Sequence, residues 1–189
     1  YFERLRDEVS IPIVYVSHAA AEVARLATTV VALEKGWVIR QGPAIEVLGD
    51  PMIAPTGIRA VGALLEAKVA AHHEDGLTEL AAGPEPLFLP RINQPVGKTL
   101  RIRIAAQEVI LARAYPQDLS ALNILSGTVE AVRTGEGPGA IVSVKTAAGA
   151  VLARVTQRSV ARLGLAPGSE CFAVLKSVAV APEDVGQGV

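Results

Sequence analysis

The first continuous apolar run of this 189-residue chain is IPIVYV at residues 11–16. Such a run predicts a strand that is buried on both faces of a parallel sheet. Ser17 predicts the N-cap of a helix over residues 19–26, so that His18 lies where a strand passes into a helix. The pattern that follows predicts a hairpin and a short helix, formed by 29–33 with 37–40 and by 43–48.

From about Gly57 the pattern changes to short β-rich runs that are separated by turn residues, as expected of a small barrel or sandwich. Arg101 and Arg103 alternate with apolar residues, and we expect this basic face of the strand to be solvated. The predicted strands are 61–71, 77–81, 86–89, 100–105, 109–112, 129–132, 140–146, 151–156 and 171–180, with a helical turn over 157–163.

The β-rich region contains a suggested internal repeat. Gly97 and Gly168 are each followed by a strand and then by a similar apolar segment, 109–112 or 178–181. We therefore predict an α/β tail followed by mostly β structure in two OB-like, five-stranded barrels. The predicted divisions are 1–55, 56–118, 119–182 and a flexible tail over 183–189.

Composition narrows the functional classes. Half of the residues are apolar, but no run approaches the roughly 18 residues of a membrane-spanning helix, and no secretory signal is present, so we expect a cytoplasmic location. The single cysteine, Cys171, lies in an apolar run and predicts a buried strand residue. A net charge of −1 argues against nucleic acid as a partner, whereas six Lys/Arg against three Asp/Glu in 119–182 suit a small anion.

A series of short segments surrounds and follows His18, namely Tyr15-Val16-Ser17-His18, Glu22, Leu26-Ala27, Val30 to Gly36, Gln41-Gly42-Pro43 and Glu46-Val47-Leu48. In order and spacing these segments resemble the end of an ABC-transporter ATPase domain. The resemblance implies that His18 is the switch histidine, which contacts the γ-phosphate of ATP and helps to hold the attacking water. Ala19 departs from the family, many of whose members have an acidic residue there.

Other parts of an ATPase site are missing from the sequence. It has no complete phosphate loop, since Ile92 stands where the run ending in Lys98-Thr99 would need its first glycine. The chain also begins at Tyr1 within a helical pattern, so we expect a piece of a longer protein. ATP with Mg²⁺ is accordingly implied for the intact protein only, and this piece is expected to be inactive alone.

Residues 119–129, LSALNILSGTV, resemble the opening of a molybdate-binding, molbindin-like (TOBE-type) domain. The resemblance implies that Ser120, Lys176 and Ser177 bind molybdate or tungstate, with Thr156 and Ser159 as further candidates. A tetrahedral dianion needs hydroxyl and backbone N–H donors and a compact positive charge, and no metal. The later segments that match this domain are Leu152 to Thr156, Ser159, Leu163 to Gly168 and Val174 to Val178.

Two features leave alternatives open. Leu122 occupies a position where some molbindin-like domains have Arg, so the site is either functional or vestigial, with Lys176 then a solvated strand residue. His72 and His73 precede Asp75-Gly76, a turn signal, and we interpret this group as a hairpin tip rather than a metal site.

Together the two resemblances imply the C-terminal part of the ATP-hydrolysing subunit of an ABC-type molybdate importer. Its partners would be membrane permease subunits, a second ATPase subunit in a homodimer and a small oxyanion, at the inner face of the plasma membrane. Two alternatives are a stand-alone molybdate storage or regulatory protein, and an importer ATPase for another substrate with a purely structural TOBE domain.

Overall fold

The computed structural model describes residues 11–48, 62–134, 137–180 and 184–187 of the chain. Residues 11–48, called the N-terminal segment below, contain helix α2 (Ala20–Leu26), the hairpin of β1 (Thr29–Glu34) and β2 (Trp37–Pro43), and helix α3 (Ala44–Leu48). The hairpin turn places Lys35 at φ 49° and Gly36 at φ 85°, a backbone conformation that glycine adopts without strain. The predicted hairpin and short helix are confirmed.

The predicted strand over residues 11–16 is wrong. These residues form no strand and are exposed, with Val14 92% and Val16 91% accessible. A strand buried on both faces needs paired strands on both sides, and no strand pairs with 11–16 in the described part of the chain. The N-cap also shifts from Ser17 to Ala19, and the Ser17 hydroxyl accepts the Ala19 N–H at 3.0 Å.

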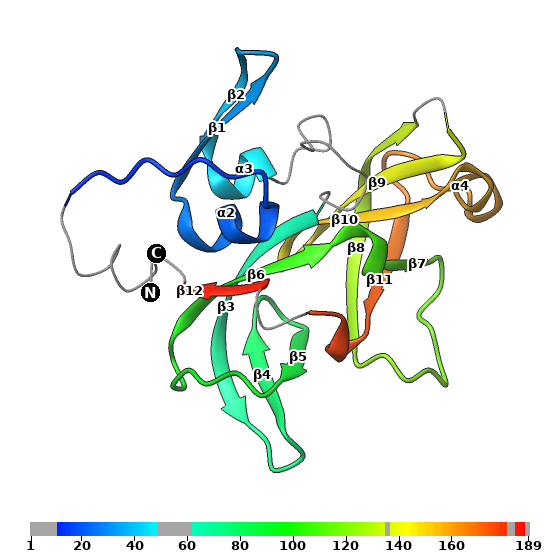
Figure 1. The fold of residues 1–189 in the computed structure, drawn as a ribbon. Coiled ribbons are helices and arrows are strands. Elements are labelled where there is room, and N and C mark those ends of the chain that lie inside the picture. The colour runs from blue at the N-terminus through cyan, green and yellow to red at the C-terminus, as the bar shows by residue number, and fades with distance from the viewer. Residues whose placement is uncertain (1–10, 49–61, 135–136, 181–183, 188–189) are drawn as a thin grey trace.

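Two five-stranded antiparallel sheets make up most of the molecule (Figure 1). Their strand orders are β12-β6-β3-β4-β5 and β7-β11-β8-β9-β10. The first six elements after the N-terminal segment are β3 (Gly62–His72), β4 (Leu77–Ala81), β5 (Pro86–Pro90), β6 (Thr99–Ala105), the 3₁₀ turn η1 (Ala106–Glu108) and β7 (Ile110–Ala112). The next seven are β8 (Asn123–Thr134), β9 (Gly139–Thr146), β10 (Gly149–Thr156), helix α4 (Gln157–Leu163), β11 (Glu170–Leu175), the 3₁₀ turn η2 (Ser177–Ala179) and β12 (Val185–Gln187).

The two sheets exchange their last strands. We call β3 to β7 the first repeat and β8 to β12 the second repeat. β7 of the first repeat pairs with β11 of the second, and β12 of the second pairs with β6 of the first. Residues 185–187, expected in a flexible tail, are therefore part of a sheet. Both sheets are open within the described residues, so closure into barrels stays a prediction.

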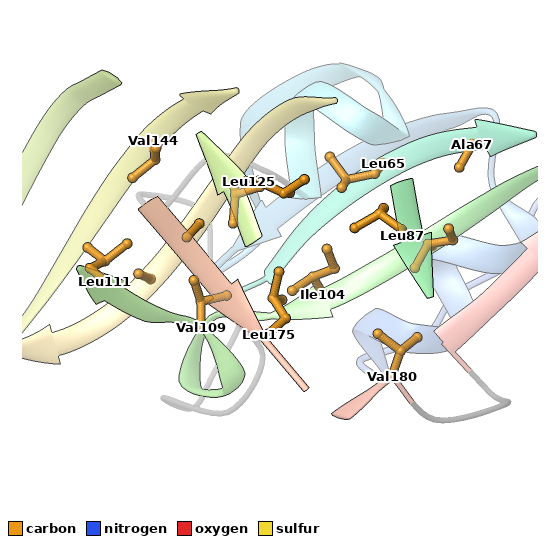
Figure 2. Close-up of a cluster of buried hydrophobic side chains, with 14 of the residues drawn as sticks. Leu65, Ala67, Leu87, Ile104, Val109, Leu111, Leu125, Val144, Leu175 and Val180 are labelled. Carbon is orange, nitrogen blue, oxygen red and sulfur yellow. The ribbon is translucent and has the colours of Figure 1, made fainter. Parts of the chain in front are cut away.

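One hydrophobic core joins the sheets. Side chains from both repeats point toward one another, including Leu65, Leu87 and Ile104 from the first and Leu125 and Leu175 from the second (Figure 2). Alternation explains this arrangement, because successive residues of a strand face opposite sides; in β9 the buried positions are Ala140, Val142, Val144 and Thr146. Cys171, 1% exposed, lies in the same core, and burial raises the pKa of its thiol.

The strand predicted over residues 171–180 ends at Leu175, and η2 follows it. The basic face of β6 is also not solvated as expected. Arg101 is only 8% exposed and donates to the Ala27 carbonyl at 2.8 Å, and Arg103 pairs with Asp184 at 3.1 Å. These contacts attach the N-terminal segment and β12 to the first sheet. Among the described helices, none is long and apolar enough to cross a membrane.

Candidate functional site

The turn that follows β11 contains two of the predicted site residues. Lys176 is the exposed N-cap of η2 and its carbonyl accepts the Ala179 N–H at 3.0 Å. Ser177 is 9% exposed, and its hydroxyl has no hydrogen-bond partner among the described residues. Since an unsatisfied buried polar group costs about 1–3 kcal/mol, this hydroxyl is suited to receive a ligand. The η2 turn thus begins with an exposed cation, which is followed in sequence by a buried hydroxyl without a partner among the described residues.

Ser120 lies at the same end of the second sheet. β8 pairs with β11 in a register that joins Asn123 to Leu175, so the residues just before β8 lie beside the residues just after β11. Ser120 is exposed and precedes β8 by three residues. Three of the five oxyanion candidates therefore gather around one end of the β8–β11 pair.

Asn123 holds this end in place, and the sequence analysis missed it. Its side chain is 1% exposed, accepts the Phe88 N–H at 2.7 Å and donates to the Phe88 carbonyl at 3.0 Å. These two bonds join the start of β8 to β5, the edge strand of the first sheet. The available signal was a polar residue at a buried position of an alternating strand.

Thr156 and Ser159 lie elsewhere. Thr156 is the N-cap of α4, where its hydroxyl accepts the Ser159 N–H at 3.0 Å and lies 2.8 Å from the Ser159 hydroxyl. Thr156 pairs with Gly139 at the far end of the sheet from Asn123. β8 runs between these ends, and 12 residues of strand span on the order of 30 Å. One chain therefore does not bring all five candidates together.

His18 is exposed and precedes α2. Near it, Tyr15 and Ser17 each donate a hydroxyl hydrogen bond to Glu22 at 2.9 Å. The hydrogen bond from Ser17 is the largest cause that lowers the pKa of the Glu22 carboxyl, and the bond from Tyr15 is the second. The hydrogen bond between Tyr15 and Glu22 also raises the pKa of Tyr15. The carboxylate beside His18 is thus held in its charged form.

Leu122 lines a hollow of mixed character, which also includes Glu85 and Ser126. The hollow has a volume of about 240 Å³, and its lining includes Leu122, Ile124, Tyr115 and Phe172. Tyr115 and Phe172 pack edge to face with ring centroids 5.6 Å apart. Leu122 remains 53% exposed. The position at which related domains can carry Arg therefore contributes apolar surface here.

The adjacent histidines of the β3–β4 hairpin have structural partners. His72 lies 3.0 Å from the Thr78 hydroxyl and 2.8 Å from the Gln94 carbonyl, and His73 contacts Glu79 at 2.9 Å. The Gln94 carbonyl requires a proton on the facing ring nitrogen of His72. No group of three or more His, Cys, Asp or Glu residues suited to a metal ion occurs in the described ranges.

Comparison with known proteins identifies relatives along the whole chain. Residues 119–182 match the TOBE domain family. The molybdenum import ATP-binding protein ModC of Mesorhizobium japonicum is 44% identical over 191 residues, which cover 100% of this chain and 52% of that protein. The ModC protein of Rhizobium etli is 45% identical over 183 residues, covering 95% of this chain and 51% of the relative. The chain thus spans about half the length of these curated relatives.

A solved structure is also similar. The cytoplasmic molybdate-binding protein ModG, crystallised with molybdate bound, superposes with a TM-score of 0.56 at 28% identity, covering 66% of this chain and 95% of that chain. Residues 119–182 therefore belong to the TOBE domain family, and the chain as a whole is similar to the C-terminal portion of molybdenum import ATP-binding proteins.

Proposed function

We propose that this chain is the C-terminal part of the ATP-hydrolysing subunit of an ABC-type molybdate importer, in which the TOBE domain binds the oxyanion and restrains transport when supply is sufficient. The observation that carries the proposal is the η2 turn, where exposed Lys176 precedes Ser177, whose buried hydroxyl has no hydrogen-bond partner among the residues that the structure describes. Similarity to ModC proteins and to a molybdate-bound protein supports it.

The oxyanion would bind at the end of the β8–β11 pair. Molybdate and tungstate are tetrahedral dianions whose oxygens accept charge-assisted hydrogen bonds. Lys176 would supply a compact positive charge, and Ser120 and Ser177 would donate their hydroxyl hydrogens. The Ser177 hydroxyl makes no hydrogen bond within the described structure. A hydrogen bond to the oxyanion would therefore offset the free-energy cost of burying this hydroxyl away from water.

A second copy of the chain would complete the donor set. Thr156 caps α4 and Ser159 lies in its first turn, at the end of the sheet opposite Asn123, so they reach the oxyanion only if another subunit presents them. Their hydroxyls are at the surface or partly so, which leaves them accessible to a neighbouring subunit. This arrangement agrees with a homodimer of ATPase subunits.

ATP with Mg²⁺ would bind to the intact protein, with His18 contacting the γ-phosphate. The described residues do not by themselves fit a nucleotide, because exposed His18 adjoins the Glu22 carboxylate and the sequence has no complete phosphate loop. No step of hydrolysis is therefore derived from them. We expect the chain alone to be inactive.

The exposed apolar residues of the N-terminal segment would be covered in the longer protein. Val14, Val16 and Trp37 are 79–92% exposed, and the curated relatives are about twice as long as this chain. We propose that the additional half packs against these exposed side chains. Membrane permease subunits would then hold the protein at the inner face of the plasma membrane.

Calorimetric titration of the chain with molybdate, tungstate and sulfate tests the oxyanion site. We expect binding of molybdate and tungstate, weakened roughly tenfold to a hundredfold by Lys176→Ala, since a charged hydrogen bond contributes about 1.5–3 kcal/mol. Lys145→Ala is the matched control, because Lys145 is an exposed lysine of the same sheet on β9.

Two results would contradict the proposal. Absence of heat with all three anions would leave the TOBE domain a purely structural module, as in an importer for another substrate. Equal affinities of the Lys176→Ala and Lys145→Ala variants would remove Lys176 from the site.

A further inference from the structure

The two repeats have the same order of elements. β3 corresponds to β8, β4 to β9, β5 to β10, β6 to β11, η1 to η2 and β7 to β12, and each sheet has these strands in equivalent positions. The first strand of each repeat, β3 or β8, also has a register shift at the corresponding place, between Val69 and Ala71 in β3 and between Val129 and Ala131 in β8. The repeats can therefore be compared residue by residue.

Backbone hydrogen bonds fix this correspondence. The Gly97 N–H donates to the Val69 carbonyl at 2.8 Å, and the Gly168 N–H donates to the Val129 carbonyl at 2.8 Å. Both glycines have φ 89°. In each repeat the following 3₁₀ turn begins nine positions after the glycine, so Ala105-Ala106 corresponds to Lys176-Ser177.

The corresponding turns differ in chemistry. Ala106 is 1% exposed and packs with Ala63 and Leu152, and neither Ala105 nor Ala106 has a side-chain donor. Ser177 is also buried, at 9% exposed, but its hydroxyl lacks a partner among the described residues. The η1 turn thus fills its space with packing, whereas the η2 turn retains hydrogen-bonding groups.

The second donor pair is also absent from the first repeat. α4, which is capped by Thr156 and contains Ser159 in its first turn, lies between β10 and β11. The equivalent connection, residues 91–98 between β5 and β6, contains no helix. It is tied down instead by the Ile92 N–H, which donates to the buried Thr78 hydroxyl at 3.0 Å.

We infer that oxyanion recognition is confined to the second repeat, with one tetrahedral oxyanion bound per chain at the η2 turn. The first repeat acts as a support: its edge strand β5 contacts η2 and is bonded to the start of β8 through Asn123 and Phe88. This inference rests on the proposed function, because it assigns the stoichiometry and location of the same site.

The test is the stoichiometry of molybdate binding to the full chain by calorimetry. We expect one molybdate per chain, and none for the double variant Lys176→Ala/Ser177→Ala. This variant should fold, because Lys176 is exposed and Ser177→Ala removes an unpaired hydroxyl; circular dichroism checks it. Lys68→Ala, an exposed lysine of the first repeat, is the matched control and should keep one molybdate.

The outcomes separate the two proposals. Two molybdates per chain, one molybdate retained by the double variant, or loss of binding in Lys68→Ala would each overturn the confinement to the second repeat. No binding by the unaltered chain would overturn the proposed function itself, and this inference with it.

Discussion

The N-terminal segment leaves many large apolar side chains in solvent, whereas the two sheets bury most of theirs. In the sheets, 22 residues from both repeats form one buried cluster. In the N-terminal segment the exposed residues include Ile11, Ile13, Val14, Tyr15, Val16, Val31, Leu33, Trp37, Val38 and Ile39. Similar apolar content therefore has opposite consequences in the two regions, depending on whether the chain itself supplies the opposing surface.

The difference shows what an apolar pattern requires in order to fold. An alternating strand needs one apolar layer opposite it, and each sheet of this chain provides that layer for the other (Figure 2). A continuous run such as 11–16 needs paired strands and covering layers on both faces. The N-terminal segment is held instead by α2, which lies against β6 and β12 (Figure 1).

The largest expected effect is a core truncation in the sheets. Leu125 is 0% exposed, and Leu125→Ala should lower the free energy of unfolding by about 2–5 kcal/mol. Leu33 is 64% exposed, and Leu33→Ala should change the free energy of unfolding by less than about 0.5 kcal/mol. Urea denaturation followed by circular dichroism measures both.

Leu65→Ala extends this comparison to the first repeat. Leu65 is 1% exposed and belongs to the same cluster as Leu125, so both truncations should shift one shared transition. Separate transitions for the two variants, or equal effects of Leu125→Ala and Leu33→Ala, would break the contrast between a shared core and an exposed segment.

The contact between the two regions is the next place to test. A Cβ atom on Gly186 would lie 3.0 Å from the Cα atom of Arg25, so Gly186→Val should push α2 away from β12 at a cost of about 1–3 kcal/mol. Amide hydrogen exchange of α2 should become faster, with little change in β9. Gly137→Ala, where a Cβ atom meets nothing within 4 Å, is the control. Unchanged exchange of α2 would show that its attachment does not depend on β12.

A smaller effect separates the two helices by their caps. Thr156 caps α4 with its hydroxyl, whereas Ala19 gives α2 no side-chain cap. Thr156→Ala should therefore destabilise α4 by about 1 kcal/mol, and Ala19→Ser should stabilise α2 by a similar amount. Amide exchange of each helix measures both changes. Thr156→Ser, which keeps the hydroxyl, should behave like the unaltered chain, and a loss as large as that of Thr156→Ala would exclude the cap.

Most strands could be predicted from the sequence because alternation and turn residues are local signals. The structure confirms the hairpin at Lys35 and Gly36, most strands of both sheets and the helical turn over 157–163, whereas β12 was expected to be part of a flexible tail. The pairing of β7 with β11 and of β12 with β6 could not be predicted, because it joins segments far apart in the chain. The burial of Arg101 could not be predicted either, because its side chain bonds to the Ala27 carbonyl, which is far away in the sequence.

The site divides in the same way. Lys176 and Ser177 became candidates through the resemblance to molbindin-like domains, and the β8–β11 register then brings the turn that contains them toward Ser120. The separation of Thr156 and Ser159 from that group depends on sheet geometry, which residue spacing does not reveal. The Ser177 hydroxyl has no hydrogen-bond partner among the described residues because it is buried just after β11, and residue type does not reveal that burial. The roles of His18 and of the oxyanion candidates stay predictions.

The smallest expected effect is a titration within the N-terminal segment. The hydrogen bonds from Ser17 and Tyr15 favour the charged form of Glu22 and lower the pKa of its carboxyl. Because the folded-state pKa is lowered, the contribution of these bonds is present above the usual value of 4.5 and disappears as the pH falls through the lower, folded-state value. NMR titration of the Glu22 carboxyl carbon should therefore give a midpoint below 4.5.

Two variants make this titration specific to the cluster beside His18. The Ser17 bond is the larger cause of the shift and the Tyr15 bond the second, so Ser17→Ala should raise the Glu22 midpoint more than Tyr15→Phe does. Tyr15→Phe keeps the ring and removes only the hydroxyl that donates to Glu22. If neither variant moves the midpoint, the cluster does not form in solution. The N-terminal segment would then differ from the sheets in local order as well as in apolar exposure.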